Sequence, residues 1–408
     1  MPSNEYHITR FSSGLRLVVW PLQGRVSYIG AVINAGSRDE GDDRQGLAHF
    51  VEHTIFKGTG SRSSLEISSC MEEVGGELNA YTSKDETAIY TNAPAGHADR
   101  AISLIADLVS DSRFPEAELA KEREVVVEEI NSYLDSPADS VFDEFDERIF
   151  EGCGLAHNIL GTPESVRMLT GADCRDFIDT FYAPSNMTVY AAGPDDPERI
   201  ARLVEDAFSQ LNRPAPFLAN DTPAYVEPFS EVEDDDNHQA NTVVGLPVFG
   251  HHDPRRPALL MLNNYLGGPG MNSRLNRELR DNHGYVYAVD SSINFYRDCG
   301  LLSIYFGCDT ANVDKCLRIV YDELDRLAQR RFDPDTFEKM RRQYCGQLLV
   351  ATDNHENYAM SLAKGLLYHD VVIDTDAIID SLMQTTPDDI LEVAQLLAAS
   401  KSSRLTLS

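Results

Sequence analysis

Two histidines and a glutamate stand together in the segment GLAHFVEHTIFKG, residues 46–58. His49 and His53 are four residues apart, so in a helix they lie one turn apart and can bind the same metal ion. Glu52 projects beside them, where a carboxylate can take a proton from a metal-activated water. The alternative is a solvated polar face. Because the aromatic Phe56 falls within the same arc, the pattern favours a buried cleft with a metal site.

A catalytic zinc ion needs a third protein ligand and an open position for water. The segment LAKEREVVVEEINSYLDS, residues 119–136, offers Glu122 and Glu129, which are seven residues and two helical turns apart. Carboxylates among valines are costly to bury unless they meet a cation or a hydrogen-bond donor. The alternative is an ordinary acidic helix with both side chains at its rim, and the spacing alone leaves both interpretations open.

The elements that must position these residues occur twice. RFPEAELAKEREVVVEEI (113–130) resembles RFDPDTFEKMRRQYCGQLL (331–349), and GELNAYTS (76–83) can be laid on GYVYAVDS (284–291). Strand-like patterns occur at 15–20, 28–35 and 241–248, and helical patterns at 99–111, 116–134, 311–329 and 334–350. Strands followed by helices in each half predict an α+β layer fold that is used twice.

A proline-rich stretch, LNRPAPFLANDTPAYVEPFS, divides the chain almost in half and is typical of a linker. We therefore predict an N-terminal catalytic domain at 1–212, a linker at 213–235 and a homologous C-terminal domain at 236–408. At the positions of the two acids the repeat places Met340 and Gln347, neither of which carries a negative charge. The second domain is therefore predicted to lack metal ligands.

Composition narrows the class of protein. The 408 residues include 35 basic and 66 acidic side chains, a net charge of −31 that argues against binding to nucleic acid or an anionic membrane. The sequence contains no run of about 18 apolar residues, which is the length that would predict a membrane span. The polar start lacks the pattern of a secretory signal, and seven cysteines without a CxxC pair favour reduced thiols. We expect a cytoplasmic protein.

Six segments, in order, carry a resemblance that covers nearly the whole chain. The sequence resembles the pitrilysin/insulinase family of zinc peptidases, and in particular the short, two-domain bacterial members related to mitochondrial processing peptidase. The resemblance implies two tandem homologous α/β-layer domains, half-barrel-like units with a sheet covered by helices, that enclose a cavity. The segments are AGSRDE (35–40), GLAHFVEHTIFKGT (46–59), GGELNAYTSKDET (75–87), EREVVVEEI (122–130), FYAPSNMTVYAAG (181–193) and GGPGMNSRLNRELRDNHGYVYAV (267–289).

Position by position, the resemblance implies roles for the first half of the chain. His49, His53 and Glu129 would bind one zinc ion per chain, and Glu52 would be the general base. Glu122 would orient the site by holding a ligand rather than the metal.

The resemblance also implies substrate contacts. Asn79 and Ala80 would lie on an edge strand that pairs with a bound peptide. From the second half, Arg280 would bind a substrate carbonyl or help to position the peptide, and the Tyr287 hydroxyl would donate to the oxyanion. Tyr285 is a nearby alternative, but the family spacing of seven residues favours Tyr287.

The function implied is a zinc-dependent endopeptidase that hydrolyses short unfolded peptides with a metal-activated water. Because both sets of site residues are on one chain, we expect a self-sufficient subunit that forms a homodimer. Its partners would be peptide substrates, with no nucleic acid or membrane. The alternative is a catalytically silent scaffold or partner subunit of a processing-peptidase-like complex, although such chains tend to lose the ligands or the base.

Overall fold

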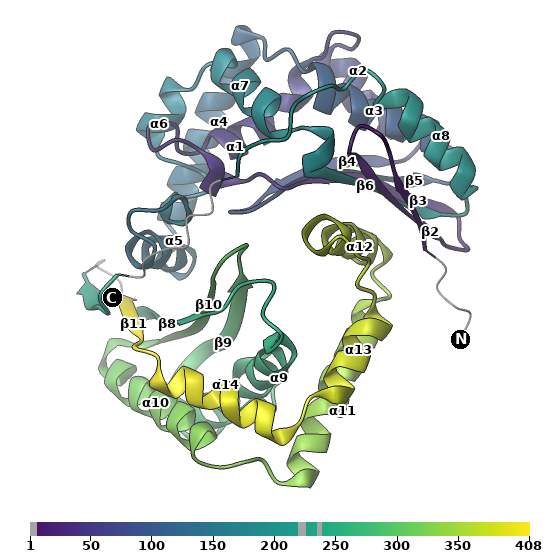
Figure 1. Cartoon of the computed structure of the whole chain (residues 1–408). Helices are drawn as coiled ribbons and strands as arrows, with labels where there is room; N and C mark the ends of the chain where they lie inside the picture. The colour runs from purple at the N-terminus through teal and green to yellow at the C-terminus, as the bar shows by residue number, and fades with distance from the viewer. Residues whose placement is uncertain (1–5, 219–225, 235–238) are drawn as a thin grey trace. The chain divides into compact units, whose positions relative to one another are not determined.

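Two β-sheets organise the chain, and each is the centre of one unit (Figure 1). The computed structural model describes residues 6–218, 226–234 and 239–408. The first unit takes residues 1–131, 157–219 and 351–374, and the second takes 132–156, 220–350 and 375–408. Within the described ranges, no helix is both long enough and apolar enough to cross a membrane.

The first sheet has six strands in the order β1-β2-β6-β3-β5-β4. Its strands are β1 (His7–Arg10), β2 (Arg16–Pro21), β3 (Val26–Ile33), β4 (Glu77–Thr82), β5 (Thr87–Pro94) and β6 (Met187–Gly193). β3 pairs antiparallel with both β5 and β6, and its residues Ile29, Ala31 and Ile33 enter the main core of the unit. β4 lies at the edge of this sheet, with only β5 beside it among the described residues.

Helices cover both faces of the first sheet, with α12 on one face and the other helices on the opposite one (Figure 1). The amphipathic helix α3 places its apolar residues on β3 and β5. The helical elements of this unit are η1 (Ser37–Asp39), α1 (Leu47–Thr54), η2 (Ile55–Lys57), α2 (Ser64–Glu72), α3 (Ala98–Asp111), α4 (Glu116–Leu134), α6 (Pro163–Met168), α7 (Gly171–Phe181), η4 (Pro184–Asn186), α8 (Pro197–Ala207) and α12 (His355–His369).

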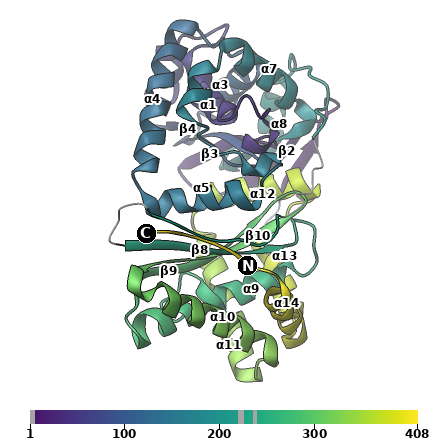
Figure 2. The same cartoon turned by 90° about the vertical axis from the view of Figure 1, so that its left-hand side faces the viewer.

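The second sheet has five strands in the order β7-β11-β8-β10-β9, with α5 on one face and α9, α10 and α14 on the other (Figure 2). Its strands are β7 (Ser230–Glu233), β8 (Gln239–Val248), β9 (Val286–Phe295), β10 (Gly300–Asp309) and β11 (Ser403–Leu407). The helical elements are α5 (Pro137–Ile149), η3 (Gly154–Ala156), α9 (Arg256–Gly267), η5 (Asn276–Asn282), η6 (Thr310–Asn312), α10 (Val313–Gln329), α11 (Pro334–Ala351), α13 (Thr375–Gln384) and α14 (Pro387–Ala399).

The two sheets share one topology. In the first sheet β6, β3, β5 and β4 are neighbours, and in the second β11, β8, β10 and β9 follow the same antiparallel order. β2 then joins β6 in parallel, as β7 joins β11. The predicted α+β fold with a repeated unit is therefore confirmed, and the two segments matched in the repeat become the edge strands β4 and β9.

Most predicted elements occur where the periodicity placed them, and α4 has the predicted bounds. The helix that carries the paired histidines covers only part of the segment 46–58. α1 ends at Thr54, a 3₁₀ turn follows to Lys57, and Gly58 (φ +137°) stops the helix in a conformation that side chains disfavour. Phe56 therefore belongs to the 3₁₀ turn, where it packs on the main core.

The predicted linker, 213–235, is partly structured. Residues 219–225 and 235 lie outside the described residues, but β7 forms within the segment because it gains a parallel partner in β11. Glu231 of this acidic strand is 3.1 Å from Arg148 of α5, so part of the acidic segment forms ion pairs.

Each unit contains one helix from the other half of the chain. α12 packs through Tyr358, Leu362 and Leu366 against Val18 and Val32 of the first sheet. In the same way, apolar residues of α5 cover β8 and β11 of the second sheet. The predicted boundaries at 212 and 236 therefore do not describe the compact units in these two segments. Each sheet has an apolar face that the helices of its own half of the chain do not cover, and a helix from the other half packs on it.

A buried carboxylate fastens α12 to the first sheet. Glu86, at the start of β5, accepts hydrogen bonds from the hydroxyls of Tyr81 (2.6 Å) and Tyr368 (2.5 Å), and it forms an ion pair with Lys364. Tyr368 and Lys364 are both on α12, so one carboxylate joins three side chains from two elements.

We predict that Glu86→Gln lowers the free energy of unfolding by about 2 kcal/mol, because it leaves Lys364 without its buried counter-charge. The measurement is chemical denaturation of the purified chain. Glu198→Gln is the control, since its pair with Arg202 is exposed and the change should stay within about 0.5 kcal/mol. Equal effects of the two changes would contradict the assignment.

Candidate metal centre

Helix α1 presents the paired histidines because its other face is fixed in the core. Leu47, Phe50 and Val51 are fully or almost fully buried among apolar side chains. His49 is itself only 7% exposed, whereas His53 is half-buried. The helix is therefore held over most of its circumference, and its polar side has little freedom to rotate.

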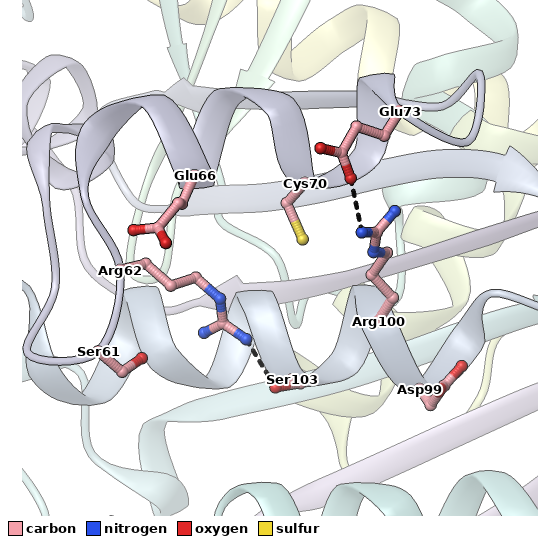
Figure 3. Close-up of a pocket in the computed structure, with 8 residues that line it drawn as sticks. All are labelled: Ser61, Arg62, Glu66, Cys70, Glu73, Asp99, Arg100 and Ser103. Atoms are coloured by element: carbon pink, nitrogen blue, oxygen red, sulfur yellow. Dashed lines mark hydrogen bonds and ion pairs between the residues drawn. The ribbon is translucent and has the colours of Figure 1, made fainter.

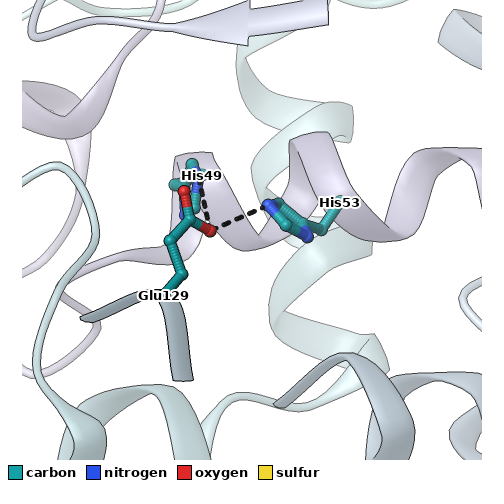
Figure 4. A group of neighbouring side chains, drawn as sticks. All are labelled: His49, His53 and Glu129. Atoms are coloured by element: carbon teal, nitrogen blue, oxygen red, sulfur yellow. Dashed lines mark ion pairs between the residues drawn. The ribbon is translucent and has the colours of Figure 1, made fainter. Parts of the chain in front are cut away.

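Helix α4 brings the third side chain. Val126, Val127 and Ile130 anchor it in the core, so that Glu129 points at α1 while 41% of its side chain stays exposed (Figure 4). Val125 is exposed instead of buried, so the acids do not sit in a wholly apolar face. The choice between a metal ligand and a rim acid therefore depends on what the carboxylates contact.

The three predicted ligands converge. Oε2 of Glu129 is 3.4 Å from Nε2 of His53 and 3.8 Å from Nε2 of His49 (Figure 4). The two imidazole rings have centroids 4.7 Å apart. All three ligand atoms lie within 4.8 Å of one another, which is the only such group of three or more in the described ranges.

This arrangement fits a zinc ion. A tetrahedral ion about 2.1 Å from each ligand keeps the ligand atoms about 3.4 Å apart, close to the separations seen here. Two nitrogens and one carboxylate oxygen are also a donor set that zinc takes at catalytic sites, and the exposure of Glu129 leaves one side open for water.

The electrostatics keep the first imidazole neutral, as a metal ligand must be. Burial, assisted by the neighbouring His53, lowers the pKa of His49 to about 3. Its Nδ1 atom is buried and has no hydrogen-bond partner among the described residues. The ring of His49 is therefore held by packing and by the backbone of α1, and its Nε2 is the atom that faces Glu129.

The second histidine is oriented from behind. Nδ1 of His53 is 3.4 Å from Oε2 of Glu122, while its Nε2 faces Glu129. The other oxygen of Glu122 is 2.7 Å from Nζ of Lys57. Glu122 therefore takes the place predicted for it, behind a ligand, and Lys57 balances its charge.

Glu52 is on the same side of α1, between the two histidines in sequence. Burial raises the pKa of its carboxyl group, and the negative charge of Glu129 acts in the same direction. A carboxylate with a raised pKa is a stronger base at neutral pH.

The predicted peptide-binding strand is β4, at the edge of the first sheet and in contact with α1. Asn79 points to the exposed side and Ala80 packs partly on the core. An edge strand offers unpaired backbone groups to an extended peptide.

Arg280 and Tyr287 belong to the second unit. Arg280 is exposed in the π-helix η5, and Tyr287 is the extra residue of a β-bulge in β9, since Gly307 lies opposite Ala288 and Cys308 opposite Val286.

The bulge turns Tyr287 to the exposed face of the sheet, where 44% of the residue is accessible. A side chain on Gly307 would lie 2.6 Å from Cε2 of the Tyr287 ring, so only glycine leaves room for the ring across β10. Burial raises the pKa of Tyr287, which favours the protonated hydroxyl as a donor.

Helix α11 of the second unit corresponds to α4 in the repeat. Met340 is buried in the apolar core of α11, and Gln347 is half-buried and uncharged. Among the described residues, no metal-ligating cluster forms in this unit.

A separate polar pocket of about 560 Å³ opens between α2 and α3 (Figure 3). Its two arginines are neutralised, since Arg62 binds Asp107 at 2.5 Å and Arg100 binds Glu73 at 2.8 Å. Burial raises the pKa of the Cys70 thiol and so weakens it as a nucleophile. We assign this pocket no role.

Sequence reasoning missed two residues beside the centre. Lys57 follows His53 by four residues, so its helical position gave a signal. Glu40 gave none beyond its place in the AGSRDE segment, yet its carboxylate accepts hydrogen bonds from the first turn of α1.

Comparisons with known proteins bear on the family. Residues 21–163 match the model described as insulinase (peptidase family M16), and residues 169–344 match the M16 inactive-domain model. An uncharacterized zinc protease of Streptomyces coelicolor is 33% identical over 95% of this chain and 86% of its own length. A Bacillus subtilis protein of the same description is 32% identical over 80% and 79%.

Two solved structures share the fold. A protease from Helicobacter pylori superposes with a TM-score of 0.90 at 21% identity, covering 99% of both chains. A peptidase M16 inactive domain from Pseudomonas fluorescens gives 0.91 at 16% identity, covering 98% of both. On the sequence matches, the chain belongs to the insulinase family of peptidases, family M16.

Proposed function

We propose that this protein is a zinc-dependent endopeptidase with its centre at His49, His53 and Glu129. The observation that carries the proposal is the convergence of the three ligand atoms within 4.8 Å, with the carboxylate of Glu52 on the same side of α1. The names of the relatives, which are zinc proteases, support the same metal and the same class of reaction.

Each residue of the centre would have a separate role in peptide-bond hydrolysis. Zinc, when bound, supplies a Lewis acid that acidifies water and polarises a carbonyl. Glu52 accepts the water proton and passes it to the leaving amine. Glu122 holds the ring of His53, and the raised pKa of Glu52 suits proton transfer near neutral pH. Neither step needs a covalent intermediate on the enzyme.

The substrates would be short unfolded peptides. An extended peptide would pair with β4 near Asn79 and Ala80 and present one peptide bond to the centre. Arg280 and Tyr287 keep the roles that the resemblance implies, with the Tyr287 hydroxyl as a donor to the oxyanion.

The second candidate, a silent scaffold or partner subunit, has one observation in its favour. The family model over residues 169–344 and one structural neighbour are both described as inactive domains. The family model covers mainly the second unit, where Met340 and Gln347 stand at the positions of the two acids, whereas the structural neighbour covers 98% of this chain. We favour the enzyme because the first unit retains all three proposed ligands and the base.

We predict that the purified, zinc-loaded protein cleaves a quenched fluorescent peptide and that a chelator abolishes the cleavage. Glu52→Gln should retain about one zinc per chain and lose turnover by about 10²–10⁴-fold, because only the base is removed. The measurements are metal analysis and kcat. Glu128→Gln, an exposed neighbour of the centre, is the control and should keep wild-type activity. Substantial cleavage by a clean Glu52→Gln preparation would refute its role.

We predict that Tyr287→Phe lowers kcat by about 10²-fold with little change in KM, because a donor to the developing oxyanion is lost. Steady-state kinetics on the same peptide provide the measurement. Tyr285→Phe is the matched control, since Tyr285 packs under Lys315 (5.1 Å from the ring centroid) and should be dispensable. An unchanged kcat for Tyr287→Phe would mean that other groups stabilise the oxyanion.

We also propose that the protein is a homodimer, since one chain carries both sets of site residues. Light scattering after size exclusion at micromolar concentration should give twice the chain mass of 45.4 kDa. A mass that stays at the monomer value across this range would count against the dimer.

A further inference from the structure

The first turn of α1 does not cap itself. Gly46 precedes the helix in a left-handed conformation (φ +85°), and no side chain at that position accepts a hydrogen bond. The first N–H groups of a helix have no partner within it, and in a buried setting each one needs an acceptor. The acceptor must therefore come from elsewhere in the chain.

Glu40 supplies it from six residues upstream. Its Oε2 accepts from the backbone N–H of Gly46 at 2.8 Å, and its Oε1 accepts from that of Ala48 at 2.6 Å. Both oxygens are used, and the residue is only 8% exposed. Ala48 directly precedes His49, so the carboxylate holds the backbone next to a predicted ligand.

Glu40 is fixed at its other end as well. Ser37 and Arg38 donate backbone hydrogen bonds to the β4–β5 turn, to the carbonyl oxygens of Ser83 and Lys84. The side chains of Arg38 and Asp85 form an ion pair at 3.0 Å with only 4% and 8% exposed. The segment that carries Glu40 is thereby attached to the sheet.

A cation accompanies the buried carboxylate. Burial raises the pKa of Glu40 well above its ordinary value, and the N–H groups of Ala48 and Gly46 and the charge of Lys84 oppose this. Lys84 is also buried, with Nζ 2.6 Å from the carbonyl oxygen of His157. A buried polar network of this kind is retained at a cost, and Glu40 connects it to the first turn of α1.

We propose that Glu40 is a positioning residue for the metal centre: by binding the first turn of α1, it fixes His49 and His53 relative to Glu129. The inference rests on the proposed function, because the centre it serves is the zinc site. The donor separations of 3.4 and 3.8 Å leave little tolerance for a shift of the helix. Both oxygens of Glu40 accept from backbone N–H groups at the start of α1, so its proposed action is through the helix.

The test is Glu40→Gln in the full chain. The amide retains one acceptor but turns an NH₂ group toward an N–H donor, so one of the two hydrogen bonds is lost. We expect Co²⁺ affinity to fall roughly ten-fold or more, as for other groups that orient ligands. The d–d absorption of the cobalt-loaded protein should change, and amide hydrogen exchange in residues 46–51 of the metal-free protein should speed up.

The matched control is Glu66→Gln. Glu66 accepts from the backbone N–H of Ser63 at 2.8 Å at the start of α2, which carries no ligand. It should leave the cobalt affinity and spectrum unchanged. If Glu40→Gln does not fold, Glu40→Asp keeps the charge and shortens the reach, and a smaller change in the same direction is expected. Wild-type cobalt affinity and spectrum in both Glu40 variants would overturn the proposal.

The outcomes separate the two proposals. If the wild-type protein binds cobalt but shows no chelator-sensitive cleavage, the proposed function fails, and the spectra of the Glu40 variants still decide the positioning role. If the wild-type protein cleaves peptides and Glu40→Gln keeps the wild-type spectrum, only the positioning role fails. A wild-type protein that binds no cobalt refutes both.

Discussion

One carboxylate that faces two imidazoles is the constraint on which the rest of the first unit depends. Three electron-pair donors that lie within 4.8 Å of one another repel unless a cation or a proton lies between them. The protein keeps them together by anchoring α1 and α4 separately in the main core. The anchored helices therefore determine how the three side chains face one another.

The two histidines of the centre have different surroundings. Glu122 lies behind His53 and is balanced by Lys57, whereas the Nδ1 of His49 has no hydrogen-bond partner within the described ranges. The two ligands are therefore positioned by different means. His53 is oriented through its own ring, and His49 depends on the backbone of α1, whose first turn is bound by Glu40. Under our proposal, Glu40 therefore bears on the centre through the backbone of α1, although it lies outside the helix.

The two units use one topology for different purposes. The edge strand β4 is regular and contacts the metal helix, whereas its counterpart β9 contains a bulge that turns Tyr287 to the exposed face. The helix α4 carries acids where α11 carries Met340 and Gln347. The two units therefore share one sheet topology and differ at the acids of α4 and at the bulge in β9.

Local patterns were enough to predict the main strands and helices and the types of donor atom at the centre. The periodicity of 116–134 gave the bounds of α4, and the spacing of His49 and His53 required a shared helical face, because both are local consequences of backbone geometry. The sequence could not choose between Glu122 and Glu129 without the resemblance, since both lie on one face of α4.

Tertiary contacts settle which acid faces the imidazoles and that α12 and α5 cover sheets of the other half of the chain, because these contacts join residues far apart in sequence. Glu40 is only six to eight residues from the N–H groups that it binds, but neither a helical nor a strand periodicity predicts that contact.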